Sequence, residues 1–183
     1  MMIFKNFLNI KKKKKIKKDF LNLLKNQPQL FESLKPTYKY SYSKKKISKY
    51  KKFSNIRVIG MGGSILGTEA IYDFLKKKIK KKIIFVNNLN SNAGYFNFKN
   101  INLNLIISKS GNTLETIANA NTLIKNKDSN IIITENKDSY LTNLASQLKA
   151  EIFEHKNYVG GRYSVLSEVG MLPAELMNLN ESK

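Results

Sequence analysis

The sequence has 183 residues, of which 42% are hydrophobic, and this is enough for one domain with a hydrophobic core. No apolar run approaches the roughly 20 residues that a membrane-spanning helix needs, and the N-terminus lacks the pattern of a signal peptide. We therefore expect a cytoplasmic protein. The absence of cysteine excludes disulfides and thiolate metal sites.

The formal net charge of +20 raises the question of a nucleic-acid partner, because lysine-rich surfaces bind nucleic acid in a salt-dependent way. Lys, Asn and Ile, however, are over-used along the whole chain, as AT-rich coding DNA would produce. The only arginines are Arg57 and Arg162, whereas nucleic-acid sites usually use clustered arginine for bidentate contacts. We attribute the charge to composition and expect no nucleic-acid partner, with a basic nucleic-acid-binding protein as the weaker alternative.

Residues 1–50 are predicted to form a basic helical arm and a lead-in to the domain. One helix of this arm has apolar residues at i, i+4, i+7 and i+8 on a surface otherwise covered by lysine: Ile16, Phe20, Leu23 and Leu24. We expect this helix to be solvated and not membrane-bound, although basic amphipathic helices can bind anionic lipid. Pro28 and Pro36 interrupt helix formation, and the domain itself is predicted to span residues 51–183.

Short β-branched runs recur within this domain and predict strands at 56–59, 83–86, 103–107, 131–134 and, more weakly, 151–153. Three amphipathic helices alternate with them, with apolar faces made of Leu66, Ala70, Ile71 and Phe74, of Leu114, Ile117, Ala118 and Ile124, and of Leu141, Leu144, Ala145 and Leu148. The segment after Val86 is Asn-rich and only weakly helical. The alternation predicts an α/β fold, a three-layer sandwich with a Rossmann-like parallel sheet of about five strands. Ligands of such folds bind at the carboxyl ends of the strands, so the loops there are the candidate site.

The first candidate loop follows the strand 56–59 and reads Gly60-Met61-Gly62-Gly63-Ser64-Ile65-Leu66-Gly67, with a helix after it. Glycines let several backbone N–H groups point at one anion, and the helix N-terminus adds partial positive charge. A dinucleotide fingerprint would need glycine at position 65 and an acid near Asn87, and a Walker A loop would need lysine in place of Thr68. Both motifs fail. Taken alone, the loop is also compatible with tight packing of a strand against a helix.

The second candidate loop follows the strand 103–107 and reads Ser108-Lys109-Ser110-Gly111-Asn112-Thr113. Asn112 and Glu115 have the spacing of a capping box, so a capped helix explains part of the loop. Three hydroxyls beside Lys109 exceed what a cap needs and suit the terminal oxygens of a phosphate monoester. Two such loops on one sheet favour phosphate binding over coincidence.

The third candidate segment contains Gly160-Gly161-Arg162, ahead of a helical stretch capped by serine. The two glycines let the backbone turn sharply. Arg162 is one of two arginines in a chain dominated by lysine, which indicates that guanidinium geometry matters at this position. A surface or structural arginine is the alternative.

Together, G-M-G-G-S-I-L-G, S-K-S-G-N-T-L-E-T and V-G-G-R-Y-S-V-L-S-E-V-G resemble motifs of the phosphoglucose isomerase (glucose-6-phosphate isomerase) family. The first two alone would indicate only a sugar isomerase (SIS) domain, and the third, around Arg162, narrows the resemblance to this family. It spans about residues 50 to 180. The resemblance implies a SIS-type fold, reversible conversion of glucose 6-phosphate to fructose 6-phosphate, no cofactor or metal, and the homodimer that is common in the family.

The resemblance also implies residues that bind the substrate and its phosphate, partly through backbone N–H groups: Gly63, Ser64, Ser108, Lys109, Ser110, Gly111, Asn112 and Thr113. Gly111 and Asn112 stand where other members have bulkier or hydroxyl residues. Arg162 is implied to be catalytic, because it would stabilise the negative charge of a cis-enediolate, and Gly161 would shape its approach.

The family's proton-transfer groups are a glutamate, a histidine and a lysine, all C-terminal to the Gly-Gly-Arg motif. The sequence ends at Lys183, shortly after that motif, so we expect an N-terminal portion of the enzyme that is inactive or nearly so by itself, from a truncated gene, a split gene or an incomplete reading frame. A sugar-phosphate-binding SIS module without catalysis is the alternative. Among local residues, we expect His155 to lie in a surface loop, and neither Glu168 nor Glu175 matches the family's base.

Overall fold

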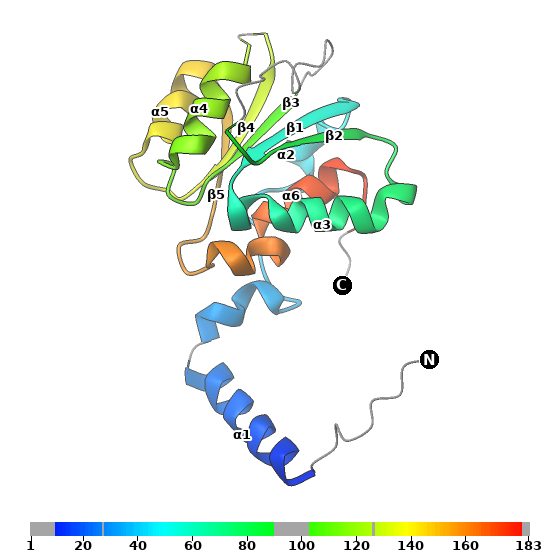
Figure 1. The fold of residues 1–183 in the computed structure, drawn as a ribbon, viewed down its shortest axis with the longest axis vertical. Coiled ribbons are helices and arrows are strands. Elements are labelled where there is room, and N and C mark those ends of the chain that lie inside the picture. Colours follow the sequence, from blue (N-terminus) through cyan, green and yellow to red (C-terminus); the bar gives the residue numbers. More distant parts are fainter. Residues whose placement is uncertain (1–9, 27, 90–102, 126, 181–183) are drawn as a thin grey trace.

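The computed structural model describes residues 10–26, 28–89, 103–125 and 127–180, and its centre is a five-stranded sheet (Figure 1). All neighbouring strands pair in parallel, in the order β2-β1-β3-β4-β5. The strands are β1 (Asn55–Gly60), β2 (Lys82–Val86), β3 (Leu103–Ile107), β4 (Ser129–Thr134) and β5 (Glu151–Glu154). The five strands predicted from β-branched runs are confirmed, including the weak run at 151–153.

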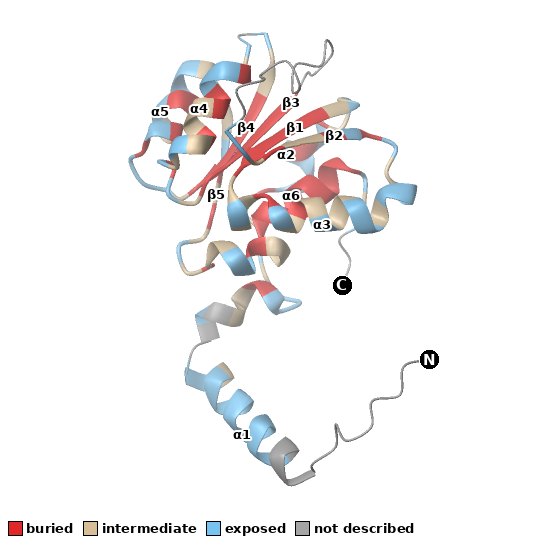
Figure 2. Cartoon of the chain, viewed as in Figure 1, coloured by how far each residue is buried: buried red, intermediate tan, exposed pale blue. Residues whose placement is uncertain are grey.

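Helices cover both faces of the sheet (Figure 1): α3 (Leu66–Leu75) and α6 (Glu168–Leu176) on one, and α4 (Leu114–Leu123) and α5 (Tyr140–Leu148) on the other. Successive residues of a strand point to opposite faces, so Leu105 packs in the core beneath α6 while Ile106 packs beneath α4 and α5. Every residue of β3 is buried, and Figure 2 shows the central strands buried along most of their length. The predicted three-layer α/β sandwich is therefore confirmed.

The first 50 residues contain α1 (Ile10–Asn26), the 3₁₀ helix η1 (Pro28–Leu34) and α2 (Lys44–Ser48). Helix α1 extends away from the sheet (Figure 1), and the apolar side chains Ile16 and Phe20 of its predicted stripe are exposed. The lead-in after η1 differs, because Tyr42, Ile47 and Tyr50 are buried in the core. The division of the chain at residue 50 stays a prediction. None of the described helices has the length and apolar content that a membrane crossing needs.

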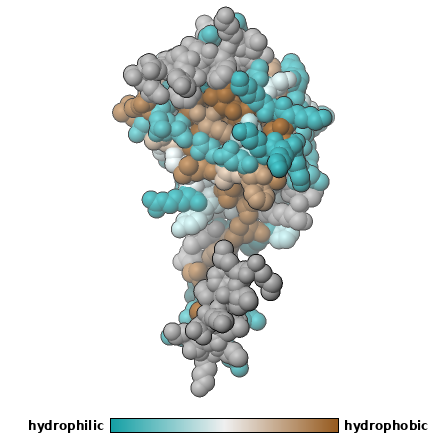
Figure 3. Space-filling view, turned by 45° about the vertical axis from the view of Figure 1, so that its right-hand side comes forward, coloured by the Kyte–Doolittle hydropathy of each residue, from teal (hydrophilic) through white to brown (hydrophobic). Residues whose placement is uncertain are grey.

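Helix α3, which continues into the short 3₁₀ helix η3 (Lys76–Lys78), turns a different face to the core than its periodicity predicts. Leu66 and Phe74 are 57% and 88% exposed. Figure 3 shows that apolar surface lies among hydrophilic side chains on one face of the molecule. Thr68 is instead fully buried, and its hydroxyl donates to the Val169 carbonyl of α6 over 3.0 Å. The predicted apolar face is wrong at Leu66 and Phe74, because α3 packs on the core through Thr68, Ile71 and Tyr72 instead.

A row of polar residues crosses the three central strands near their amino ends. Arg57, Asn104 and Asn130 pair in register on β1, β3 and β4 and are all buried. Arg57 Nη1 donates to Asn104 Oδ1 (3.1 Å) and to the Leu123 carbonyl (2.7 Å), and Asn104 Nδ2 donates to Asn130 Oδ1 (2.9 Å). Burial lowers the pKa of the Arg57 guanidinium, and the nearby Asp128 carboxylate opposes this effect. Arg57 thus has a structural role that its scarcity in the sequence did not indicate.

The substitution Asn104→Ala is expected to lower the free energy of unfolding by about 2–3 kcal/mol, because the Arg57 charge would stay in the core with one acceptor fewer. Urea denaturation followed by circular dichroism measures this loss. Asn143→Ala, at an exposed position of α5, is the matched control and should change the free energy by less than about 0.5 kcal/mol. An equal effect of the two substitutions would contradict the role of the polar row.

Candidate functional site

The order of the strands places both candidate loops at one point of the sheet. The chain runs from β1 outward to β2 and then returns to β3 on the other side of β1, so the winding direction reverses between β1 and β3. At the carboxyl ends of these neighbours, Gly60 pairs with Ile107. The loops that follow, 60–67 and 108–113, therefore leave the sheet side by side. In doubly wound sheets, ligands bind in the crevice at this reversal.

A cavity of about 320 Å³ lies between these loops and is lined by Ser64, Lys109, Ser110, Thr113, Glu135 and Lys137. Four of these residues are predicted from the sequence to bind the substrate or its phosphate. The other four predicted ligands of this kind (Gly63, Ser108, Gly111 and Asn112) belong to the same two loops but do not line the cavity. The structure thus brings hydroxyls from both loops together with a lysine ammonium.

The Ser108–Thr113 loop is held in shape by its own polar side chains. The hydroxyls of Ser108 and Thr113 lie 2.9 Å apart, and Ser110 Oγ accepts a hydrogen bond from the Asn112 amide over 3.2 Å. Gly111 has a φ of +70°, and a Cβ there would lie 2.2 Å from Ser139 Oγ, so only glycine fits. Thr113 is the N-cap residue of α4 and makes no capping bond with its side chain. The first N–H groups of α4 consequently lie beside the cavity without a side-chain acceptor from Thr113.

Asn112 has a different partner from the one that its spacing to Glu115 predicts. Its Oδ1 accepts from the amide of Tyr140 over 2.8 Å, at the start of α5. The predicted capping box on α4 is therefore wrong, because the left-handed turn at Gly111 allows Asn112 to reach the neighbouring helix. A direct contact of Asn112 with phosphate stays a prediction.

The third segment touches the first loop backbone to backbone. A Cβ on Gly63 would lie 2.2 Å from the Gly161 carbonyl oxygen and 2.7 Å from the Arg162 amide nitrogen. The hydroxyl of Ser164 donates to both carbonyls at this contact, over 2.7 Å to Gly161 and 3.2 Å to Gly63. Arg162 is the second residue of the 3₁₀ helix η5 (Gly161–Leu166), and its backbone is thereby held against Gly63 in η2 (Gly62–Ser64).

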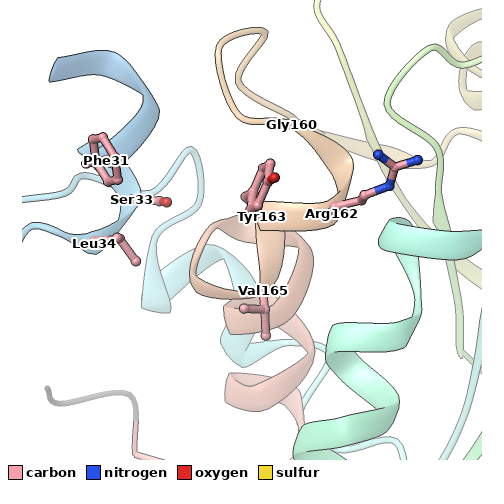
Figure 4. Close-up of a pocket in the computed structure, with 7 residues that line it drawn as sticks. All are labelled: Phe31, Ser33, Leu34, Gly160, Arg162, Tyr163 and Val165. Carbon is pink, nitrogen blue, oxygen red and sulfur yellow. The ribbon is translucent and has the colours of Figure 1, made fainter. Parts of the chain in front are cut away.

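The Arg162 side chain is exposed, and within the described part of the chain no hydrogen bond or ion pair holds it. Arg162 does not line the cavity between the two loops but lines a second, mainly apolar cavity of about 450 Å³, together with residues that include Phe31, Leu34 and Tyr163. Figure 4 shows the guanidinium pointing away from these apolar side chains. An exposed guanidinium with no protein partner can bind an anionic group of a ligand.

Glu135 and Lys137 are cavity residues that the sequence reasoning missed. They follow directly after β4, and the rule that ligands bind beyond the carboxyl ends of parallel strands would have found them. Glu135 lies 3.6 Å from Lys109 Nζ and 2.5 Å from Lys137 Nζ. The hydrogen bond from Lys137 lowers the pKa of the Glu135 carboxyl, against the opposing effect of partial burial.

His155 is buried, with 1% of its surface exposed, so the predicted surface loop is wrong at this residue. Its amide donates to the Thr134 carbonyl over 2.8 Å and extends the pairing of the short strand β5 with β4. Burial lowers the pKa of the imidazole, and its Nδ1 lies 3.1 Å from the Lys156 carbonyl oxygen. The ring does not line the cavity between the two loops.

The two glutamates of α6 bind residues of the segment ahead of β1 and do not line the cavity. Glu168 is fully buried and accepts from the Tyr38 hydroxyl (2.9 Å) and the Ser41 amide (2.8 Å). Glu175 is buried and pairs with the ammonium of Lys51. Both carboxylates therefore have structural partners, and neither is placed to act as a base on a ligand in the cavity.

A parallel sheet with this strand order, with a glycine-rich loop and a Ser-Lys-Ser-Gly-Asn-Thr loop at its winding reversal, defines a domain of the sugar isomerase class. The match of the phosphoglucose isomerase family to residues 8–179 identifies the particular family, and the chain belongs to it. Glucose-6-phosphate isomerase of Methanocaldococcus jannaschii is 34% identical over 181 residues, which cover 91% of this chain and 44% of that protein. The enzyme of the same name from Borrelia garinii is 36% identical, over 66% of this chain and 26% of that protein. The chain thus spans less than half the length of these curated relatives.

Solved structures support the same fold. A hypothetical protein from Thermus thermophilus superposes with a TM-score of 0.71 at 21% identity, over 90% of this chain and 43% of that one. Tagatose-6-phosphate ketose/aldose isomerase from Escherichia coli superposes with a TM-score of 0.58 at 16% identity, over 75% of this chain and 42% of that one. At these identities the likeness concerns the fold alone.

The substitution Gly63→Ala is expected to lower the free energy of unfolding by about 1–3 kcal/mol, because the methyl group would push the Gly161–Arg162 peptide away. Thermal and urea denaturation measure the effect. Gly161→Ala is the matched control, since a Cβ there has no neighbour within 4 Å. If the two substitutions cost the same, the close backbone contact is not a constraint on the fold.

Proposed function

We propose that this chain supplies the sugar-phosphate-binding part of a glucose-6-phosphate isomerase, which interconverts glucose 6-phosphate and fructose 6-phosphate. The observation that carries the proposal is the backbone contact of Gly63 with Gly161, which joins the first loop to the segment of Arg162. The first loop in turn shares a cavity with the second loop through Ser64. Membership of the phosphoglucose isomerase family supports the choice of substrate. Residues 51–183 are proposed as the binding domain, and the homodimer implied by the family stays a prediction.

The second loop is proposed to bind the phosphate. Ser110, Thr113 and Lys109 line the cavity, and the N-terminus of α4 begins immediately after Thr113. Hydroxyl and amide donors can each take one terminal oxygen of a phosphate, and the partial positive charge of the helix end stabilises the dianion. Ser64, on the other side of the cavity, is proposed to contact the sugar.

Arg162 is proposed to act on the reacting carbons. Isomerisation removes a proton from C2 and returns one at C1, and the intermediate enediolate carries a negative charge on oxygen. A guanidinium placed beside that oxygen stabilises the charge as it develops. The exposure of Arg162 and the lack of a protein partner among the described residues support this role.

The described residues offer no base suited to this reaction. Glu135 is the one carboxylate that lines the described cavity, and its pairing with two lysines keeps its pKa low, which makes it a weak base near neutral pH. The family resemblance implies a glutamate, a histidine and a lysine for proton transfer, at positions beyond the Gly-Gly-Arg motif. We therefore expect the 183-residue chain by itself to bind the sugar phosphate without turning it over.

Fructose 6-phosphate should raise the melting temperature of the chain, fructose should not, and a coupled assay should detect no isomerisation. The double variant Ser110→Ala/Thr113→Val should bind about tenfold or more weakly, because hydrogen bonds to a charged group contribute ~1.5–3 kcal/mol each. Thr122→Val, at an exposed position of α4, is the control and should bind like the native chain.

Equal stabilisation by fructose and fructose 6-phosphate would contradict a phosphate site. Turnover by the purified 183-residue chain at rates typical of enzymes would contradict the assignment of proton transfer to groups outside the described residues. A non-catalytic module would also bind fructose 6-phosphate without turnover. The catalytic part of the proposal is therefore tested by joining the chain to the remaining length of a relative and assaying isomerisation.

The substitution Arg162→Ala should leave the affinity for fructose 6-phosphate within about threefold of the native value, because an interaction made with the developing enediolate contributes little to ground-state binding. Isothermal titration calorimetry measures the affinity, and far-UV circular dichroism checks the fold. A folded Arg162→Ala variant that no longer binds the sugar phosphate would show that the arginine, and not the second loop, holds the phosphate.

A further inference from the structure

The turn after β4 brings a second lysine into the cavity of the proposed phosphate site. Lys137 lines this cavity together with Ser110 and Thr113, and its side chain is 50% exposed. Neither the family motifs nor the predicted phosphate loop include this residue. Its ammonium adds a positive charge to a cavity that already contains the ammonium of Lys109.

Backbone hydrogen bonds fix this turn against the phosphate loop. The amide of Glu135 donates to the Lys109 carbonyl over 3.1 Å, and the amide of Lys137 donates to the Glu135 carbonyl over 2.9 Å. The hydroxyl of Thr134, the last residue of β4, reaches the same Lys109 carbonyl over 3.4 Å. The position of Lys137 is therefore set by the loop that is proposed to bind the phosphate.

Glu135 contacts both ammonium groups of the cavity. Its Oε2 lies 2.5 Å from Lys137 Nζ and its Oε1 lies 3.6 Å from Lys109 Nζ, and the carboxylate is 14% exposed. Lys109 Nζ has a further partner in the Asn157 carbonyl, at 2.7 Å, whereas Lys137 Nζ has Glu135 as its one polar partner among the described residues. Of the two lysines, Lys137 is the one that can turn to a new anion by giving up a single partner.

We propose that Lys137 is a phosphate-binding residue of this site and that Glu135 competes with the phosphate for it. The inference rests on the proposed function. A phosphate dianion between Ser110, Thr113 and Lys137 takes a hydrogen bond from the ammonium, which is a charge-assisted contact. The nearby Glu135 carboxylate repels the same dianion, so it lowers the affinity of the site and favours release of the sugar phosphate.

Removing the two charges of this pair should have opposite effects on binding. Lys137→Met should weaken the binding of fructose 6-phosphate about 3- to 10-fold, because one charge-assisted contact at a partly exposed site is lost. Glu135→Gln should tighten it about 2- to 5-fold, because the competing carboxylate is gone and the lysines keep their charge. Both effects should shrink at an ionic strength of about 1 M, where exposed charges are screened within roughly 3 Å.

The experiment is calorimetric titration of the 183-residue chain and its variants with fructose 6-phosphate, with fructose as the ligand that lacks phosphate. Lys125→Met is the matched control, since this exposed lysine precedes β4 at the amino end of the sheet and its removal changes the net charge by the same amount. Its affinity should equal that of the native chain. Circular dichroism confirms that each variant is folded.

Equal affinities of Lys137→Met and Lys125→Met would overturn the assignment of Lys137. Weaker binding in Glu135→Gln would overturn the competition, because it would mean that the carboxylate only orders the lysines. Binding that depends on Ser110 and Thr113 but not on Lys137 would overturn this inference and leave the proposed function intact. Absence of fructose 6-phosphate binding in the native chain would overturn both.

Discussion

The contact between Gly63 and the Gly161–Arg162 peptide is the constraint on which the site depends. These two segments lie about a hundred residues apart in the sequence, yet a single methyl group on Gly63 would overlap the peptide that carries Arg162. The Ser164 hydroxyl closes the contact by donating to the carbonyls on both sides. Because only glycine fits at this point, backbone packing alone sets where Arg162 lies relative to the first loop. The Arg162 side chain is not needed to hold this position.

The sheet supplies the second half of the arrangement. The winding reverses between β1 and β3, and the loops after these two strands project into the crevice at this reversal. The turn after β4 lines the same cavity with Glu135 and Lys137. The polar row from Arg57 to Asn130 crosses the same three strands near their amino ends and joins them in register. Buried hydrogen bonds thus join the strands near their amino ends, whereas the polar groups at the carboxyl ends line a cavity where a charged ligand can bind.

The sequence predicted the strands and the loops at their ends correctly, because these features depend on short stretches of neighbouring residues. Buried parallel strands are continuous β-branched runs, so all five were predictable, and the residues Ser64, Lys109, Ser110 and Thr113 were predictable as one cluster because the loops follow strand ends. Periodicity failed at α3, because Thr68 and not Phe74 faces the core. The capping prediction failed at Asn112, because spacing does not reveal a positive φ at the preceding glycine. The predicted surface loop is wrong at His155, because its amide continues the pairing of β5 with β4 and its ring is buried.

The most direct measurement is a titration of the ¹⁵N-labelled chain with fructose 6-phosphate, followed by the chemical shifts of the backbone amides. Binding between the two loops predicts shifts at residues 62–65, 108–114 and 161–162, with little change at the amino ends of β1 and β4. Fructose at the same concentration should produce no such pattern. Shifts confined to the lysine-rich helix α1, or equal shifts with both sugars, would contradict a sugar-phosphate site at the carboxyl edge of the sheet.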